Sequence, residues 1–128
     1  MAKIILASHG GLSKGMKDSV SMIVGDLAKD IETYSLLPGK NPEDFYQEVL
    51  KEAKESEEQI VILCDIKGGS VHTALSKLAV LDNVMVFSGM NMGLVLDAVM
   101  KGLNGKLELA EANDLIEAAK DGMTVMNG

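Results

Sequence analysis

The sequence has a single cysteine, Cys64, among its 128 residues. One cysteine excludes an internal disulfide and a cysteine-based zinc site, and it fits the reducing cytoplasm, where we expect the protein to work. Tryptophan is absent, and two tyrosines and two phenylalanines leave little surface for stacking on bases. Twelve basic residues stand against nineteen acidic ones, a formal net charge of −7. We therefore expect no nucleic-acid partner, because binding the phosphate backbone needs a cationic face.

Long hydrophobic runs are also missing. The apolar run near the start covers only residues 4–7, whereas a membrane-spanning helix needs about 20 apolar residues and a signal peptide also needs a longer stretch. The overall composition is nevertheless that of a globular protein, with 47% hydrophobic and 24% charged residues. The length lies in the usual range of one domain, ~100–150 residues, so we expect a single domain over residues 1–128.

Short apolar runs alternate with amphipathic stretches along the chain. The runs at 3–7, 31–37, 59–64 and 83–87 predict strands, and 59–64 should be central because it is apolar throughout. Helical spacing predicts helices from residue 12 to Gly25, after the capping residue Asn41, and over 70–80, 93–101 and 108–120. This alternation predicts an α/β fold of flavodoxin-like size, with an open, mainly parallel four-stranded sheet and helices on both faces. Residues 123–126 predict one more short strand.

Polar residues follow two of the predicted strands, where parallel sheets bind their ligands. His9 and Asp65 come after the first and third strands, and each precedes a pair of glycines. Taken alone, His9 is more often a turn residue, Asp65 a helix cap, and a glycine pair a plain turn. Together they indicate an imidazole whose tautomer a carboxylate fixes, beside an anion-binding loop. Such a combination is typical of a histidine that accepts a phosphoryl group.

Other residues near these loops have less specific interpretations. Ser70 begins the predicted helix at 70–80 and either donates its hydroxyl to an anion or caps the helix. His72 follows within a turn and either lines the same crevice or lies on the surface. Met90 offers a roof over the site, although core packing is the simpler interpretation. Lys14 and Lys67 are candidate positive charges near the two loops. A metal site is less favoured, since no closing ligand accompanies two histidines and one carboxylate.

Two stretches resemble a known family. The segments ILASHGGLSKGMKDSVSMIVG and LCDIKGGSVHTAL are similar to the two signatures of the IIA domain of the mannose/fructose-type sugar phosphotransferase system. The similarity in order and spacing of elements extends over nearly the whole chain. Val71 and His72 depart from the family's usual pattern, which leaves the detail of this loop and the choice of partner open.

The resemblance implies a function and site residues. His9 would accept the phosphoryl group at the ring nitrogen remote from Asp65, which holds the other nitrogen. Ser70 would help to hold the phosphoryl group, and we expect Gly10 and Gly69 to offer phosphate-binding N–H groups. The donor would be phosphorylated HPr and the acceptor a separate IIB subunit, which serves the membrane components IIC and IID during sugar uptake. The family is homodimeric, with the last strand exchanged between subunits, and no metal or organic cofactor is implied.

Three alternatives remain open. The phosphohistidine subunit of a dihydroxyacetone kinase system shares the fold and an early histidine, although the Gly-Gly-Ser after Asp65 and the glycine after His9 favour the sugar system. A regulatory or anion-binding module of the same fold would use His9 only as a hydrogen-bonding group. A chelatase-like metal enzyme also has a histidine at a strand end followed by glycine, and tight metal binding would reveal it.

Overall fold

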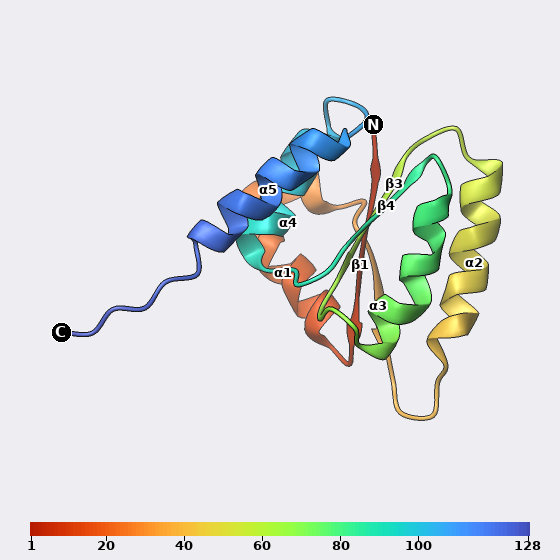
Figure 1. The fold of residues 1–128 in the computed structure, drawn as a ribbon, viewed down its shortest axis with the longest axis horizontal. Coiled ribbons are helices and arrows are strands. Elements are labelled where there is room, and N and C mark those ends of the chain that lie inside the picture. Colours follow the sequence, from red (N-terminus) through yellow and green to blue (C-terminus); the bar gives the residue numbers. More distant parts are fainter.

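The computed structural model describes residues 1–128 and has one four-stranded parallel sheet. The strands are β1 (Lys3–His9), β2 (Glu32–Leu36), β3 (Ile60–Cys64) and β4 (Val84–Phe87). Their order in the sheet is β2-β1-β3-β4, and every neighbouring pair is parallel. The predicted α/β fold is therefore confirmed, and all four strands end at the same edge of the sheet, the lower edge in Figure 1.

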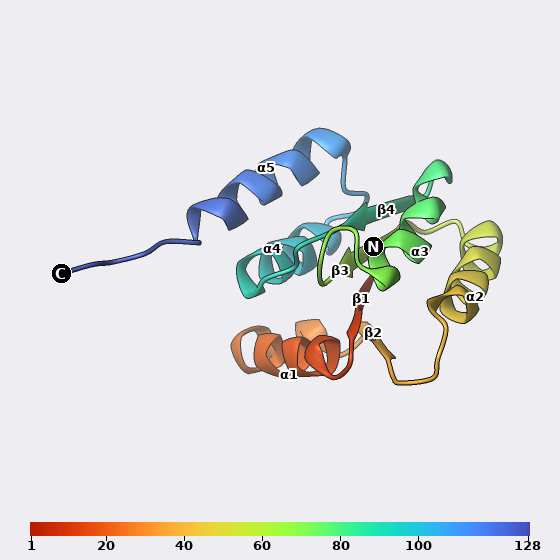
Figure 2. The ribbon, with the colours of Figure 1, turned by 60° about the horizontal axis from the view of Figure 1, so that its bottom comes forward.

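Helices cover both faces of this sheet (Figures 1 and 2). One face carries α1 (Leu12–Val24), α4 (Met92–Gly102) and α5 (Leu109–Asp121), and the other carries α2 (Pro42–Glu55) and α3 (Ser70–Leu75). Two 3-10 helices, η1 (Gly25–Ala28) and η2 (Ser76–Val80), extend α1 and α3. None of the helices combines the length and apolar composition that crossing a bilayer requires.

The two central strands are buried on both sides. In β1, Ile4 and Leu6 belong to one core cluster, and Ile5 and Ala7 belong to the other. All five residues of β3 are buried, as predicted for the most apolar strand. Successive side chains of a strand point to opposite faces, so each of these strands contributes to both cores. The pair β1 and β3 therefore forms a rigid platform for the residues that follow it.

The predicted helix signals are confirmed at two ends. Gly25 follows α1 with φ of +60°, a backbone conformation that glycine adopts without a side-chain clash. Asn41 caps α2, and its side-chain oxygen accepts a 3.0 Å hydrogen bond from the Glu43 N–H. The apolar pattern of α1 is only partly buried, because Leu12 and Ile23 are 51% and 62% exposed.

Two boundaries differ from the sequence-based expectation. β1 continues two residues beyond 3–7, so His9 is its last residue rather than a loop residue. The extension follows from pairing with β2, in which His9 faces Leu36. The helix predicted over 70–80 is α-helical only as α3 and then tightens into the 3-10 helix η2.

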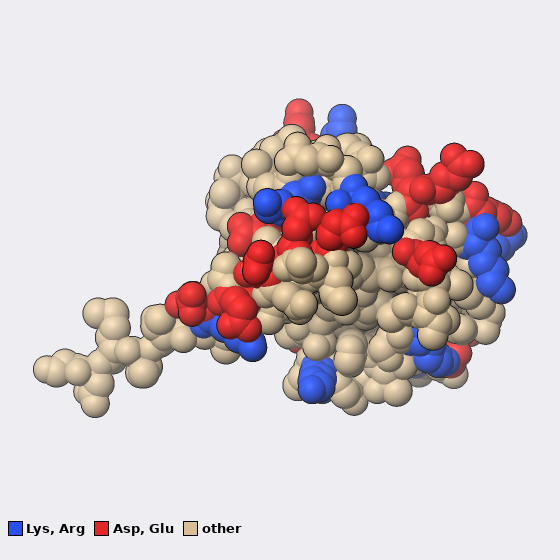
Figure 3. Space-filling view, turned by 45° about the horizontal axis from the view of Figure 1, so that its top comes forward, with Lys and Arg blue, Asp and Glu red and all other residues tan.

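The chain after α5 extends away from the body of the molecule (Figure 1). Met123, Val125 and Met126 are at least 74% exposed, and the segment carries no charged side chain (Figure 3). Residues 123–126 form no strand within the single chain. A strand here needs a neighbouring strand, so its exchange into the sheet of a second copy stays a prediction.

Candidate phosphoryl-transfer site

His9 and Asp65 meet between β1 and β3, where the strand order of the sheet reverses. From β1 the chain continues to β2 at one edge of the sheet. From β3, the other neighbour of β1, it continues to β4 at the opposite edge. Ligands of open parallel sheets bind at such a switch point, beyond the carboxyl ends of the strands. His9 ends β1, and Asp65 directly follows β3, the adjacent strand. The predicted proximity of these two residues is therefore confirmed.

The imidazole of His9 is held at both nitrogens. Its Nδ1 lies 2.7 Å from Asp65 Oδ2, and its Nε2 lies 3.1 Å from Ser70 Oγ. A carboxylate only accepts hydrogen bonds, so we assign the proton to Nδ1 and a free electron pair to Nε2. The Ser70 hydroxyl then donates to Nε2. This arrangement leaves the nitrogen remote from Asp65 as the nucleophilic one.

Asp65 is anchored by hydrogen bonds from three N–H groups. Oδ2 also accepts a 2.8 Å hydrogen bond from the His9 backbone N–H, and Oδ1 accepts one of 2.9 Å from the Ile66 N–H. Burial opposes ionisation of this carboxyl, but these hydrogen bonds and that from the His9 ring outweigh it and hold the pKa of Asp65 below its ordinary value of 3.8. Its side chain is 8% exposed, whereas that of His9 is 48% exposed. The carboxylate is thus buried, whereas the imidazole is accessible from outside.

A tight turn connects Asp65 to Ser70. The Gly69 N–H donates to the Ile66 carbonyl at 3.2 Å, and Gly68 has φ of +79°, as the third residue of a type II turn requires. A Cβ atom on Gly69 would lie 3.2 Å from Cε1 of the His9 ring and 2.8 Å from Cγ2 of Ile66. Glycine at position 69 therefore lets the turn approach the imidazole closely.

The two glycines predicted to bind phosphate already use their N–H groups within the chain. Gly10, with φ of +54°, donates to the Leu36 carbonyl at 2.9 Å. The Gly69 N–H bonds to Ile66 in the turn described above. In this structure both residues shape the loops around His9, and the one side-chain donor directed at Nε2 is the hydroxyl of Ser70.

Two buried serines, which the sequence pattern did not single out, fix the loop after His9. Ser8 Oγ accepts a 2.8 Å hydrogen bond from the Ser13 N–H, and Ser13 Oγ donates to the Tyr34 carbonyl at 2.8 Å. Both serines are fully buried. Their signal in the sequence is a serine at the end of an apolar strand and another early in the next helix, positions where buried hydroxyls need partners.

None of the remaining candidates contacts His9 through a hydrogen bond or an ion pair. Met90 is 7% exposed and belongs to a core cluster, so the interpretation as a roof over the site is wrong and core packing is confirmed. Lys14 and Lys67 are exposed and form no ion pair. His72 is half-buried, and its Nδ1 accepts a hydrogen bond from the Gly68 N–H rather than contacting His9.

Comparison with known proteins identifies the family. The family described as the PTS system fructose IIA component matches residues 3–118. The chain belongs to this family. It is therefore a component of the sugar phosphotransferase system (PTS), and the general role of this IIA protein is phosphoryl transfer.

Curated and solved relatives agree with this assignment. The chain is 31% identical over 101 residues to the PTS system sorbose-specific EIIA component of Klebsiella pneumoniae, covering 77% of this chain and 73% of that protein. A PTS IIA protein associated with the fucose utilization operon of Streptococcus pneumoniae is 26% identical, with a TM-score of 0.78 over 97% of this chain and 92% of that chain. The phosphotransferase system component EIIA of Streptococcus agalactiae shares the fold, with 24% identity and a TM-score of 0.82 over 98% and 97% of the two chains.

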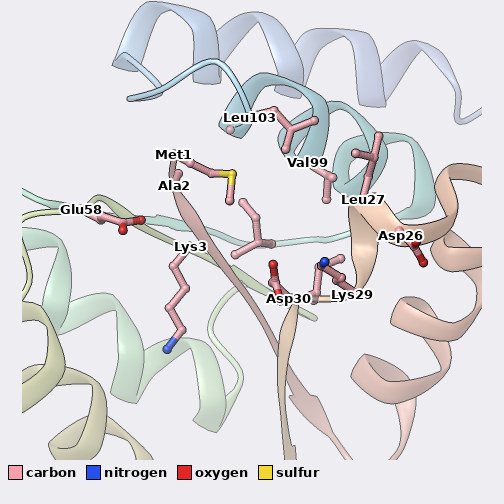
Figure 4. Close-up of a pocket in the computed structure, with 13 residues that line it drawn as sticks. Met1, Ala2, Lys3, Asp26, Leu27, Lys29, Asp30, Glu58, Val99 and Leu103 are labelled. Atoms are coloured by element: carbon pink, nitrogen blue, oxygen red, sulfur yellow. The ribbon is translucent and has the colours of Figure 1, made fainter.

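A cavity of this IIA protein lies at the opposite edge of the sheet. It has a volume of about 550 Å³ and is mostly apolar, with charged side chains at its rim (Figure 4). It is lined by Met1, Ala2, Lys3, Ile4, Asp26, Leu27, Lys29, Asp30, Ile31, Glu58, Val99, Gly102 and Leu103. These residues surround the amino ends of β1 and β2, and none is a histidine, serine or cysteine. His9 is not among the residues that line this cavity, and it lies at the other end of β1.

Proposed function

We propose that the protein is a phosphocarrier that accepts a phosphoryl group from phosphorylated HPr on His9 and passes it to a IIB subunit. The observation that carries this proposal is the orientation of the imidazole, with Nδ1 2.7 Å from the buried Asp65 carboxylate and Nε2 facing the Ser70 hydroxyl. Family membership supports the general reaction, and the geometry supports Nε2 as the acceptor atom.

The proposed transfer forms one bond to phosphorus and breaks another. The Nε2 electron pair of His9 attacks phosphorus, and the donor group of HPr takes the electron pair of the bond that breaks. His9 keeps its Nδ1 proton throughout and becomes an imidazolium ring that carries the phosphoryl group at Nε2. The ionised Asp65 stabilises this positive ring. The Ser70 hydroxyl, released when Nε2 bonds phosphorus, turns to donate to a phosphoryl oxygen. Attack by a IIB histidine reverses these events.

We propose that partners dock on the surface around His9. Leu12 and Ile66, next in sequence to the two site loops, are 51% and 59% exposed, and Leu37, which follows the β2 residue paired with His9, is 53% exposed. Lys14 and Lys67 add positive charge to the same edge. Exposed apolar side chains beside a reactive group are typical of a protein-binding surface. The net charge of the whole chain does not oppose docking, because the contact is local.

We also propose that the protein is a homodimer, as the family resemblance implies. β4 is an edge strand of the sheet, and the uncharged tail from residue 123 onward pairs with no strand of its own chain. Exposed apolar tails and unpaired strand edges complement each other by strand addition. Sedimentation of the full chain against a variant that ends at Asp121 tests this, and an equal mass for both would contradict it.

Incubation with phosphoenolpyruvate, Enzyme I and HPr tests the proposed function. The wild type should form an acid-labile, alkali-stable phosphoryl adduct that His9→Ala does not form. The adduct is then chased with a mannose-type IIB protein and, in parallel, with a dihydroxyacetone kinase. Loss of label to IIB supports the sugar system, and loss of label to the kinase supports the dihydroxyacetone kinase system. A wild type that gains no label would instead support a regulatory or anion-binding module.

A further inference from the structure

The turn between Asp65 and Ser70 sets the spacing of the two groups that grip His9. Asp65 contacts Nδ1 and Ser70 contacts Nε2 of the same ring, and residues 66–69 span the interval between them. Gly69 presses this turn against Cε1, the carbon between the two nitrogens. Any change in the shape of the turn therefore alters how the carboxylate and the hydroxyl match the imidazole.

His72 also contacts this turn, through the Gly68 backbone. Its Nδ1 accepts a 3.1 Å hydrogen bond from the Gly68 N–H, and Thr73 Oγ1 lies within 3.4 Å of the Gly68 carbonyl. His72 is the third residue of α3, the position from which a side chain can reach back to N–H groups before the helix. The backbone N–H and C=O of Gly68 are thus both hydrogen-bonded to side chains of α3, and Gly68 is the residue of this turn with positive φ.

The partner of His72 fixes its tautomer. A backbone N–H can only donate, so Nδ1 of His72 must be the unprotonated nitrogen and Nε2 carries the proton. His9 has the reverse arrangement, because its Nδ1 faces a carboxylate. The two histidines therefore have different roles. The electron pair of His9 Nε2 is available to attack phosphorus, whereas that of His72 Nδ1 accepts a hydrogen bond from the turn.

We propose that His72 is a positioning residue for phosphoryl transfer, which fixes the turn 66–69 so that Asp65 and Ser70 engage the His9 ring together. This proposal rests on the proposed function. Losing one such hydrogen bond should slow the phosphorylation of His9 by about three- to tenfold, the size expected for a single net hydrogen bond.

Three substitutions of His72 test whether the acceptor atom at the position of Nδ1 matters, rather than the volume of the side chain. His72→Asn places its amide oxygen where Nδ1 lies and should keep the hydrogen bond to Gly68. His72→Gln places its amide one atom farther along, and His72→Leu has no acceptor. Phosphorylation by phospho-HPr should be near the wild-type rate for His72→Asn and slower for the other two variants. Melting of each variant, followed by circular dichroism, ensures that rates are compared where all of them are folded.

The proposal fails if His72→Leu reacts at the wild-type rate, or if His72→Asn is as slow as His72→Leu. Nitrogen-15 NMR of the histidine rings gives a second readout that needs no transfer. The wild type should show His9 protonated at Nδ1 and His72 protonated at Nε2, and His72→Leu should weaken the Nδ1–H signal of His9. If the wild type accepts no phosphoryl group, the proposed function fails, while this NMR comparison still decides whether His72 positions the ring.

Discussion

The two edges of the sheet differ in an instructive way. The amino edge has a cavity of about 550 Å³ and a cluster in which Lys3 pairs with Glu32 and Glu52. The carboxyl edge has one exposed imidazole whose two nitrogens are each assigned a partner. The amino edge thus has a cavity, and the carboxyl edge has an oriented imidazole. A protein that exchanges phosphoryl groups with other proteins, as we propose for this chain, needs an accessible, oriented atom more than it needs a cavity.

The largest effect is expected from Asp65→Asn. The amide can leave the His9 ring in the wrong tautomer and cannot stabilise the phosphorylated imidazolium. The equivalent change in a serine protease triad costs ~10⁴-fold, and we expect a smaller loss, about 10²- to 10³-fold, because no proton is shuttled here. Rapid-quench measurement of His9 phosphorylation checks this. An unchanged rate would remove the orienting role from Asp65.

The same variant tests how the ionised Asp65 side chain contributes to stability at different pH. Because the pKa of Asp65 in the folded protein lies below its ordinary value of 3.8, the ionised carboxylate stabilises the fold above that pH. This contribution is lost as the pH falls through the lowered pKa. The unfolding free energies of the wild type and Asp65→Asn, measured in urea, should therefore differ near neutral pH and converge in acid.

A smaller effect is expected from Gly69→Ala. The new Cβ would lie 2.8 Å from Ile66 Cγ2, the methyl group on its branched Cβ, and 3.2 Å from His9 Cε1, so both the turn and the imidazole must shift. We expect phosphorylation of His9 to slow about tenfold, as misplacement of reacting groups does. Gly15→Ala is the matched control, since Gly15 lies in α1 with open space around it and should gain up to about 1 kcal/mol of stability. Equal rates for both variants would contradict the close approach at Gly69.

The smallest effect is expected at the amino edge. Burial lowers the pKa of Lys3, but hydrogen bonds and charges from Glu52 and Glu32 outweigh it and raise the pKa above 10.5. Its contribution to stability is thus present below pH 10.5 and is lost as the pH rises through the raised pKa. Lys3→Met should lower the unfolding free energy by only about 0.5–1 kcal/mol, because all three groups are partly exposed. Phosphorylation of His9 should be unchanged, and a slower rate would show that the two edges are coupled.

Strand patterns predicted the arrangement of the fold and the proximity of His9 and Asp65, because parallel strands bring their carboxyl ends to one edge. The sequence alone could not show what depends on packing between elements. Met90 is buried in a core cluster built from strands and helices far apart in the sequence, and β1 extends to His9 by pairing with β2. The hydrogen bond of His72 to Gly68 depends on the turn that precedes α3, and the two glycine N–H groups at the site are occupied by carbonyls that only the folded chain brings near.

The central claim is that Nε2 of His9 carries the phosphoryl group while Asp65 holds Nδ1. Phosphorus-31 and nitrogen-15 NMR of histidine-labelled protein, phosphorylated by HPr, reports directly which ring and which nitrogen is bonded to phosphorus. The account predicts a single phosphorylated ring, His9, with the phosphorus on Nε2 and a proton on Nδ1. Phosphorus on Nδ1 of His9, or on His72, would contradict it.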